Sequence, residues 1–114
     1  MGSNSDTIFA LATPKIKSAL AVFRITGTKS FKTIKNITKI KKYKTKPSLT
    51  SVVDKDKNIV DQVVITFFKS PKSYTGEDLV EISCHGSIAV INKITEVFLN
   101  NEIRLAEPGE FTRR

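Results

Sequence analysis

The sequence places a turn, a strand and a helix start in one segment, Ser73-Tyr74-Thr75-Gly76-Glu77-Asp78-Leu79-Val80-Glu81-Ile82-Ser83-Cys84-His85-Gly86-Ser87. Residues 75–78 are polar and contain glycine, which is typical of a turn. Apolar and polar side chains then alternate, which indicates a strand. One face is apolar and belongs in a core: Val80, Ile82 and Cys84. The other face carries Glu81, Ser83 and His85. Polar groups beside a helix start are compatible with the wall of a small-molecule site, but on this stretch alone the pattern favours a sheet with one solvated face.

Outward from this segment, apolar runs predict further strands and two helices. Strands are expected at 7–12, 19–25, 49–53, 59–68, 79–84 and 103–106. One helix should begin at Thr28 or Ser30 and continue to about residue 40, and a second should follow Ser87 as its cap. The apolar stripe of the second helix is expected to consist of Ile88, Ile91, Thr95 and Phe98, widened by Ile94 and Leu99, and most of this stripe should lie in the core. Residues 108–112 are expected to form a turn.

The element order β-β-α-β-β-β-α-β predicts an α+β fold. We expect a mixed, mostly antiparallel sheet with two helices packed on one side. Apolar side chains on both faces of 59–68 indicate a central, well covered strand. Strands without a clear inside and outside suggest a surface that is buried against a partner chain.

Length and composition predict a single domain. The chain has 114 residues, of which 39% are hydrophobic. We expect a tail or cloning remnant at residues 1–6 and a domain at 7–114. No apolar run reaches the ~20 residues of a membrane span. One cysteine and one histidine exclude an internal disulfide and the usual protein-only zinc site, so no metal site is expected, and the cysteine usage fits a reducing cytoplasm.

The charge of +8 is unevenly distributed. Between Thr7 and Val53 there are eleven Lys and Arg and no Asp or Glu, whereas ten acids and eight bases follow from Asp54 onward. A basic half suggests contact with an anionic partner such as RNA. Lysine is common throughout this chain, however, and a solvated surface explains the pattern equally well.

The motifs point to binding rather than to catalysis. The chain has no phosphate-binding loop, no dinucleotide fingerprint and no nucleophile elbow, so we expect no catalytic residue and no nucleotide hydrolysis. Cys84 and His85 point to opposite faces of a strand and cannot form a thiolate–imidazole pair. The carboxylate of Glu81 can accept two parallel N–H bonds from a planar ring. Arg24 can hold an anionic group or extend to solvent.

Several motifs resemble those of one family. The segment from Thr75 to Glu81, the pair His85-Gly86, and the C-terminal Pro108-Gly109-Glu110-Phe111-Thr112-x-Arg are similar to the N-terminal domain of the tRNA modification GTPases called MnmE or TrmE. The opening of the chain, with Asp6-Thr7-Ile8, Ala12-Thr13-Pro14 and Arg24-Ile25-Thr26-Gly27, follows the same pattern. The chain departs from many members at Lys15-Ile16-Lys17-Ser18, where they have a glycine-rich loop, and at Cys84 and Ser87, where they have glycine.

The resemblance implies a fold like the tetrahydrofolate-binding domain of glycine-cleavage T-protein, and a homodimer with folate sites near the interface. It implies 5-formyl-tetrahydrofolate or 5,10-methylene-tetrahydrofolate as ligand, with Arg24 and Glu81 as folate contacts. Pocket lining is expected at Thr75, Gly76, Glu77 and His85. A further family contact, a lysine, would follow Arg114.

The resemblance also implies a role for the whole protein. Together with MnmG in the cytoplasm, it would install a (carboxymethyl)aminomethyl group at C5 of the wobble uridine of tRNA. GTP, Mg and K would bind in a GTPase domain that this chain lacks. Two alternatives remain open for the chain: a basic RNA-contact module, or a purely structural dimerisation module, in either case without a small ligand.

Overall fold

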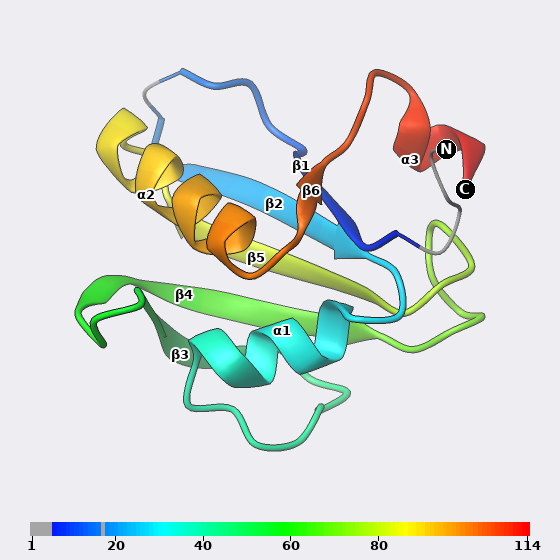
Figure 1. The fold of residues 1–114 in the computed structure, drawn as a ribbon, viewed down its shortest axis with the longest axis horizontal. Coiled ribbons are helices and arrows are strands. Elements are labelled where there is room, and N and C mark those ends of the chain that lie inside the picture. The colour runs from blue at the N-terminus through cyan, green and yellow to red at the C-terminus, as the bar shows by residue number, and fades with distance from the viewer. Residues whose placement is uncertain (1–5, 17) are drawn as a thin grey trace.

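The computed structural model describes residues 6–16 and 18–114 and shows one sheet with helices packed against it (Figure 1). The strands are β1 (Ile8–Leu11), β2 (Leu20–Thr26), β3 (Ser48–Val53), β4 (Ile59–Phe68), β5 (Leu79–His85) and β6 (Arg104–Leu105). The helices are α1 (Ser30–Ile37), α2 (Ile88–Asn100) and α3 (Glu110–Arg113). Residues 1–5 of the expected tail, and Lys17 of the loop that precedes β2, lie outside the described residues.

The strand order across the sheet of the described residues is β3-β4-β5-β2-β1-β6. All neighbouring strands pair antiparallel except β1 and β6, which are parallel. This topology confirms the expected α+β class and the mixed, mostly antiparallel sheet. The expected turn at 108–112 is wrong in part, because Gly109 adopts φ 77° and the single-turn helix α3 follows it. Four residues are too few to show a helical period in the sequence.

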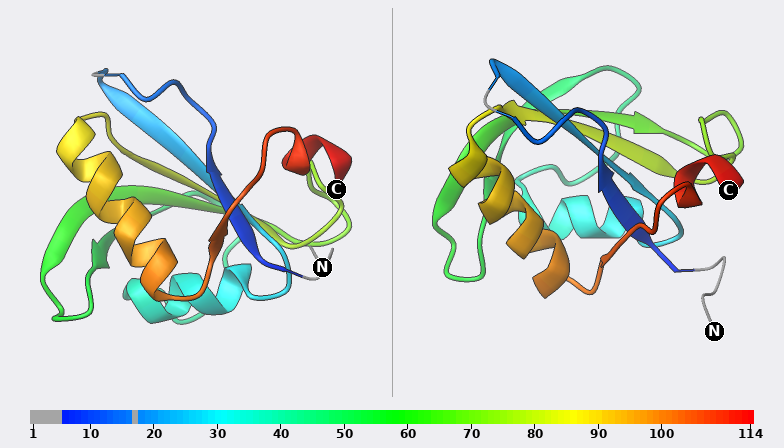
Figure 2. Two further views of the ribbon diagram at one scale, coloured as in Figure 1. Left: turned by 45° about the horizontal axis from the view of Figure 1, so that its top comes forward. Right: turned by 90° about the horizontal axis from the view of Figure 1, so that it is seen from above.

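The core lies between the sheet and the helices α1 and α2 (Figure 2). The predicted inner face of β5 is buried, and so are the alternate residues of β2: Ala21, Phe23 and Ile25. Phe98 of α2 packs against Phe9 and Phe23 with ring centroids 4.9 and 5.3 Å apart. The period-two alternation in the strands therefore predicted the core correctly.

The start of α2 is capped as expected, whereas the start of α1 is not. Ser87 Oγ accepts a hydrogen bond from the Val90 backbone N–H at 3.1 Å. The expectation that Thr28 or Ser30 caps α1 is wrong, since the capping position is Lys29 and has no side-chain cap. Ser30 Oγ instead donates to the carbonyls of Gly27 and Asp78. This hydroxyl thus joins the helix start to the loop before β5.

The residues that α2 buries differ in part from the stripe expected from the sequence. Ile91, Ile94 and Phe98 are buried as expected, and Val97 joins them. Ile88 and Leu99, which also belong to the expected stripe, are exposed. Both lie at the margin of the helical stripe, where the sequence period alone does not set the boundary of the core.

One face of the sheet carries no helix in the described part of the chain. β4 lies between β3 and β5, as a central strand should, but Val64 is 38% exposed and Thr66 and Phe68 are only half-buried. The expectation of a strand covered on both faces is therefore wrong for the described residues. We call this side of the sheet the open face. The registers place four open-face side chains in one row: Leu49, Val64, Ser83 and Val22.

Hydrogen bonds connect Arg104 and Arg114, near the C-terminal end of the described chain, to Asp6, near its N-terminal end. The guanidinium of Arg104 donates to both carboxylate oxygens of Glu110 at 2.9 and 2.7 Å, and Arg104 Nε donates to Asp6 at 3.2 Å. The guanidinium of Arg114 donates to the Asp6 carbonyl and to the Glu77 carboxylate. The hydrogen bonds from Arg104 and from the Glu107 backbone lower the pKa of Glu110 to about 2. This network connects α3 and Arg104 of β6 to Asp6, which precedes β1, and to Glu77.

Candidate functional site

Arg24 and Glu81 lie opposite each other on the open face. They are partners in the register of β2 and β5, and Arg24 Nε donates a hydrogen bond to Glu81 Oε2 at 2.9 Å. Their side chains are 38% and 32% exposed, so solvent or a ligand reaches both. The structure therefore brings together the two residues for which the family resemblance implies folate contact.

Tyr74 adds an aromatic wall to this pair. The Arg24 guanidinium carbon lies 5.7 Å from the centroid of the Tyr74 ring, within the range of a cation–π contact. The loop that carries Tyr74 is held by side-chain bonds at its base. Ser70 N–H donates to the Asp78 carboxylate and Ser70 Oγ donates to the Gly76 carbonyl. Tyr74 is not among the residues expected from the sequence, although an aromatic residue beside a polar turn is a usable signal for a ligand-facing ring.

The pair retains unused hydrogen-bonding capacity. Within the described residues, Glu81 Oε1 and the terminal amino groups of Arg24 have no protein partner. A carboxylate oxygen and a guanidinium edge on one exposed surface can bind a ligand that has N–H donors and an acceptor or anion. The next open-face row, with Val22 and Val64, adds apolar surface beside the pair.

The other expected pocket residues lie elsewhere. Thr75 is buried, and its hydroxyl shares a 2.6 Å hydrogen bond with the hydroxyl of Thr26. Gly76 and Glu77 line a shallow hollow beyond the end of β2, together with Gly27, Thr28, Lys69, Ser70 and Asp78. The Glu77 carboxylate accepts hydrogen bonds from Thr26 and Arg114, so it is already engaged.

His85 lies at the opposite end of β5 from the Arg24–Glu81 pair. It lies four positions after Glu81, which is about 13 Å along a strand. Its Nδ1 lies 2.8 Å from one carboxylate oxygen of Asp61, and its backbone N–H donates to the other. The carboxylate of Asp61 thereby joins the ends of β4 and β5. His85 and Glu81 cannot contact the same part of a small ligand.

Cys84 is a core residue, as its place in the alternation predicted. It is 1% exposed, and burial together with the charge of Asp61 raises the pKa of its thiol to about 11. The thiolate is the reactive form of cysteine. This residue therefore has no nucleophilic role at neutral pH.

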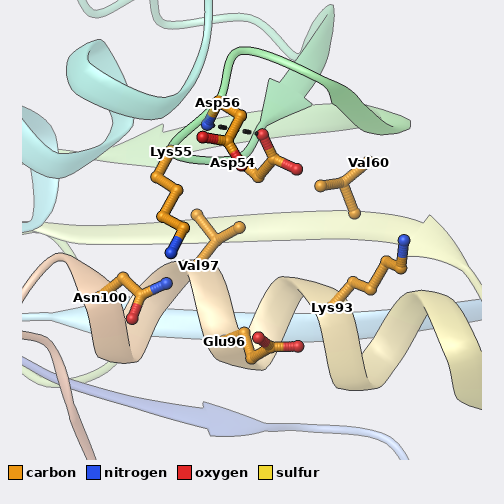
Figure 3. Close-up of a pocket in the computed structure, with 8 residues that line it drawn as sticks. All are labelled: Asp54, Lys55, Asp56, Val60, Lys93, Glu96, Val97 and Asn100. Carbon is orange, nitrogen blue, oxygen red and sulfur yellow. Dashed lines mark hydrogen bonds between the residues drawn. The ribbon is translucent and has the colours of Figure 1, made fainter.

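A further hollow of about 220 Å³ lies on the other side of the molecule (Figure 3). It is formed where the β3–β4 turn faces α2, and it is lined by Asp54, Lys55, Asp56, Val60, Lys93, Glu96, Val97 and Asn100. Its charges have both signs, and it contains none of the expected site residues. Among the described residues, no group of three His, Cys, Asp or Glu side chains is placed to hold a metal ion, and no helix is long and apolar enough to cross a membrane.

Comparison with known proteins gives a consistent set of relatives. The family described as "GTP-binding protein TrmE N-terminus" matches residues 7–114. The chain is 44% identical over 110 residues to the tRNA modification GTPase MnmE of Thermotoga maritima, covering 96% of the chain and 24% of that protein. It is 45% identical over 113 residues to the protein of the same name from Malacoplasma penetrans, covering 96% of the chain and 25% of that protein. The chain thus spans about a quarter of the length of these curated relatives.

Proposed function

Because the chain belongs to the family of TrmE N-terminal domains, we propose that it is the folate-binding and dimerising module of a tRNA modification GTPase. The family match confirms the resemblance seen in the sequence motifs. One observation carries the ligand proposal: Arg24 and Glu81 meet on an exposed sheet face beside the Tyr74 ring, with hydrogen-bonding atoms left unused.

The residues present fit a reduced folate such as 5-formyl- or 5,10-methylene-tetrahydrofolate. Glu81 Oε1 would accept hydrogen bonds from the N–H edge of the pterin ring, and Arg24 would bind an oxygen of the ligand. Tyr74 offers an aromatic face to a planar ring. When bound, the folate would supply a one-carbon unit, and the role of these residues would be to hold and orient it.

The open face supports the dimer part of the proposal. Leu20, Leu49 and Val64 are exposed on three different strands of this face, and Val22 lies in the row between them. Arg24 and Glu81 line neither of the two hollows described above, and their side chains are 38% and 32% exposed. A second copy packed on the apolar row would shield the apolar side chains and add a wall to the ligand site.

For the whole protein, we propose the activity that the relatives' name states, tRNA modification coupled to a GTPase. In this proposal it acts in the cytoplasm with MnmG on the C5 position of the wobble uridine. GTP, Mg and K would bind outside this chain, and the chain itself would be non-catalytic.

Calorimetric titration with 5-formyl-tetrahydrofolate tests the ligand site. Glu81→Ala should weaken binding by on the order of 1–3 kcal/mol, the scale of a lost charge-assisted hydrogen bond, which is about 5- to 150-fold. Glu96→Ala is the matched control, because Glu96 is an exposed carboxylate on α2, away from the open face. Equal affinity of both variants and the unmodified protein would reject the ligand site and leave a purely structural module.

Sedimentation equilibrium tests the interface separately. The unmodified protein should sediment as a dimer, and the double variant Leu49→Lys/Val64→Lys as a monomer, because each charge would be buried in the interface. Leu99→Lys, at an exposed leucine on the far side of α2, should remain a dimer. A monomeric unmodified protein at tens of micromolar would contradict this part of the proposal.

A further inference from the structure

A dense cluster of lysines covers α1 and the segment that follows it. We call this cluster the basic surface. It consists of Lys29, Lys32, Lys35, Lys39, Lys41, Lys42, Lys44, Lys46 and Lys69, all of which are exposed. Phe31, Ile34 and Ile37 turn the other side of α1 toward the core. The side of α1 away from the core therefore carries lysines. Helix α1 packs on the helix-bearing side of the sheet (Figure 1), whereas the register places Arg24 and Glu81 on the open face.

The charges of the basic surface are not neutralised by the protein. Among the described residues, every ion pair within 4 Å involves an arginine or His85, and none involves a lysine. Glu102 shares a hollow with Lys29 and Lys32 but makes no such ion pair. Close, unpaired positive charges repel one another, and an anionic partner would relieve that repulsion.

An aromatic ring is fixed within the basic surface. Tyr43 is 43% exposed and stacks on Phe31, with centroids 5.5 Å apart and planes at 25°. Phe67 meets both rings edge-on, and Lys69 Nζ lies 5.8 Å from the centroid of Tyr43. A half-exposed aromatic ring held among lysines is the combination that single-stranded nucleic acids bind, since phosphates contact lysines and bases stack on rings.

We propose that the basic surface is an RNA-binding surface, on which lysines contact the phosphate backbone and Tyr43 stacks on an unpaired base. This inference goes beyond the proposed folate site and uses a different surface of the molecule, centred on α1 and Tyr43. Binding of RNA and binding of folate can therefore be tested separately. A result that contradicts RNA binding does not contradict the folate site, and the reverse also holds.

Fluorescence anisotropy with a labelled, unmodified tRNA transcript tests the proposal. The triple variant Lys35→Glu/Lys39→Glu/Lys42→Glu should bind at least tenfold more weakly, and its affinity should fall less steeply with salt. The matched control is Lys15→Glu/Lys72→Glu/Lys93→Glu, which changes the net charge equally at exposed lysines outside the basic surface. The affinity of this control variant for the tRNA should fall less than threefold. Equal losses in the two triples, or no binding by the unmodified protein, would overturn the proposal.

Two further measurements separate RNA recognition from charge alone. Tyr43→Ala should weaken binding to a single-stranded RNA about five- to tenfold, whereas Tyr43→Phe, which keeps the stacking face, should bind like the unmodified protein. Polyglutamate should compete poorly with the RNA at equal charge concentration. Equally effective competition would assign the surface to an acidic polypeptide and overturn RNA as its partner. Circular dichroism of each variant establishes that it is folded.

Discussion

Gly27→Ala should be among the most destabilising small substitutions in this protein. Gly27 has φ +129°, a backbone conformation that residues with a side chain rarely adopt, and an added Cβ would lie 2.7 Å from both Cα and Oγ1 of Thr7. The Thr7 backbone cannot move away easily, because Thr7 Oγ1 accepts the Lys29 N–H and the Thr7 carbonyl accepts the Arg104 N–H. The Gly27 N–H also donates to the Asp78 carbonyl.

The expected cost follows from two contributions. Strained backbone costs about 1–3 kcal/mol, and overpacking against a fixed neighbour costs about 1–3 kcal/mol more. The free energy of unfolding should therefore fall by roughly 2–6 kcal/mol, a large part of the ~5–15 kcal/mol of a typical domain. Gly76→Ala is the control, because Gly76 has φ +78° but no atom within 4 Å of the added Cβ. It should cost only about 1–2 kcal/mol, from strain alone.

Urea unfolding followed by circular dichroism measures both variants. With a slope of about 1–3 kcal/mol/M, the extra packing cost of about 1–3 kcal/mol should lower the midpoint of Gly27→Ala by roughly 0.3–3 M beyond that of Gly76→Ala. Equal midpoints for the two variants would refute the reasoning, because they would show that the contact between Gly27 and Thr7 adds no packing cost.

Three further predictions concern single side chains. Cys84 should react with a thiol reagent at pH 8 far more slowly in the folded protein than in urea, because burial raises the pKa of its thiol to about 11; equal rates would contradict its burial. Glu110→Gln should destabilise the protein by about 1–3 kcal/mol at pH 7, since Arg104 loses a charged partner. The folded pKa of Glu110 is depressed to about 2, so its contribution is present above about pH 4.5 and is lost as pH falls toward 2; thermal melts of the two proteins should accordingly differ most at neutral pH and converge in acid. Ser87→Ala should cost about 1 kcal/mol through the lost cap of α2, and an unchanged urea midpoint would show that the cap contributes nothing.

The sequence predicted the elements whose signal is local. Alternation along β5 identified the buried residues Val80, Ile82 and Cys84, and the serine before α2 identified its cap. The same alternation placed Arg24 and Glu81 on outward faces, although only the family motifs paired them. Their contact depends on the register of β2 against β5, which is a property of the folded sheet.

The predictions that failed concern which other segment of the chain contacts a given strand face or side chain. The sequence of β4 is apolar on both faces, which indicates burial but does not say what would cover each face. Within the described residues, helices cover Val63 and Ile65, while Val64 is left exposed. The cap of α1 failed for a similar reason, because the hydroxyl of Ser30 is engaged by the carbonyl of Asp78, a residue far along the chain. Such contacts between distant segments have no local signature.

The parallel pairing of β1 with β6 has a consequence for synthesis on the ribosome. Ile8 and Phe9 are among the first described residues to be made, yet Arg104 and Leu105, their parallel partners, are among the last. A nascent chain can pair β1 with β2 early, but the other edge of β1 has no neighbour until β6 has been made. During that interval the unprotected edge is exposed to other growing chains, so the speed of translation across the α2–β6 codons should influence how much protein aggregates.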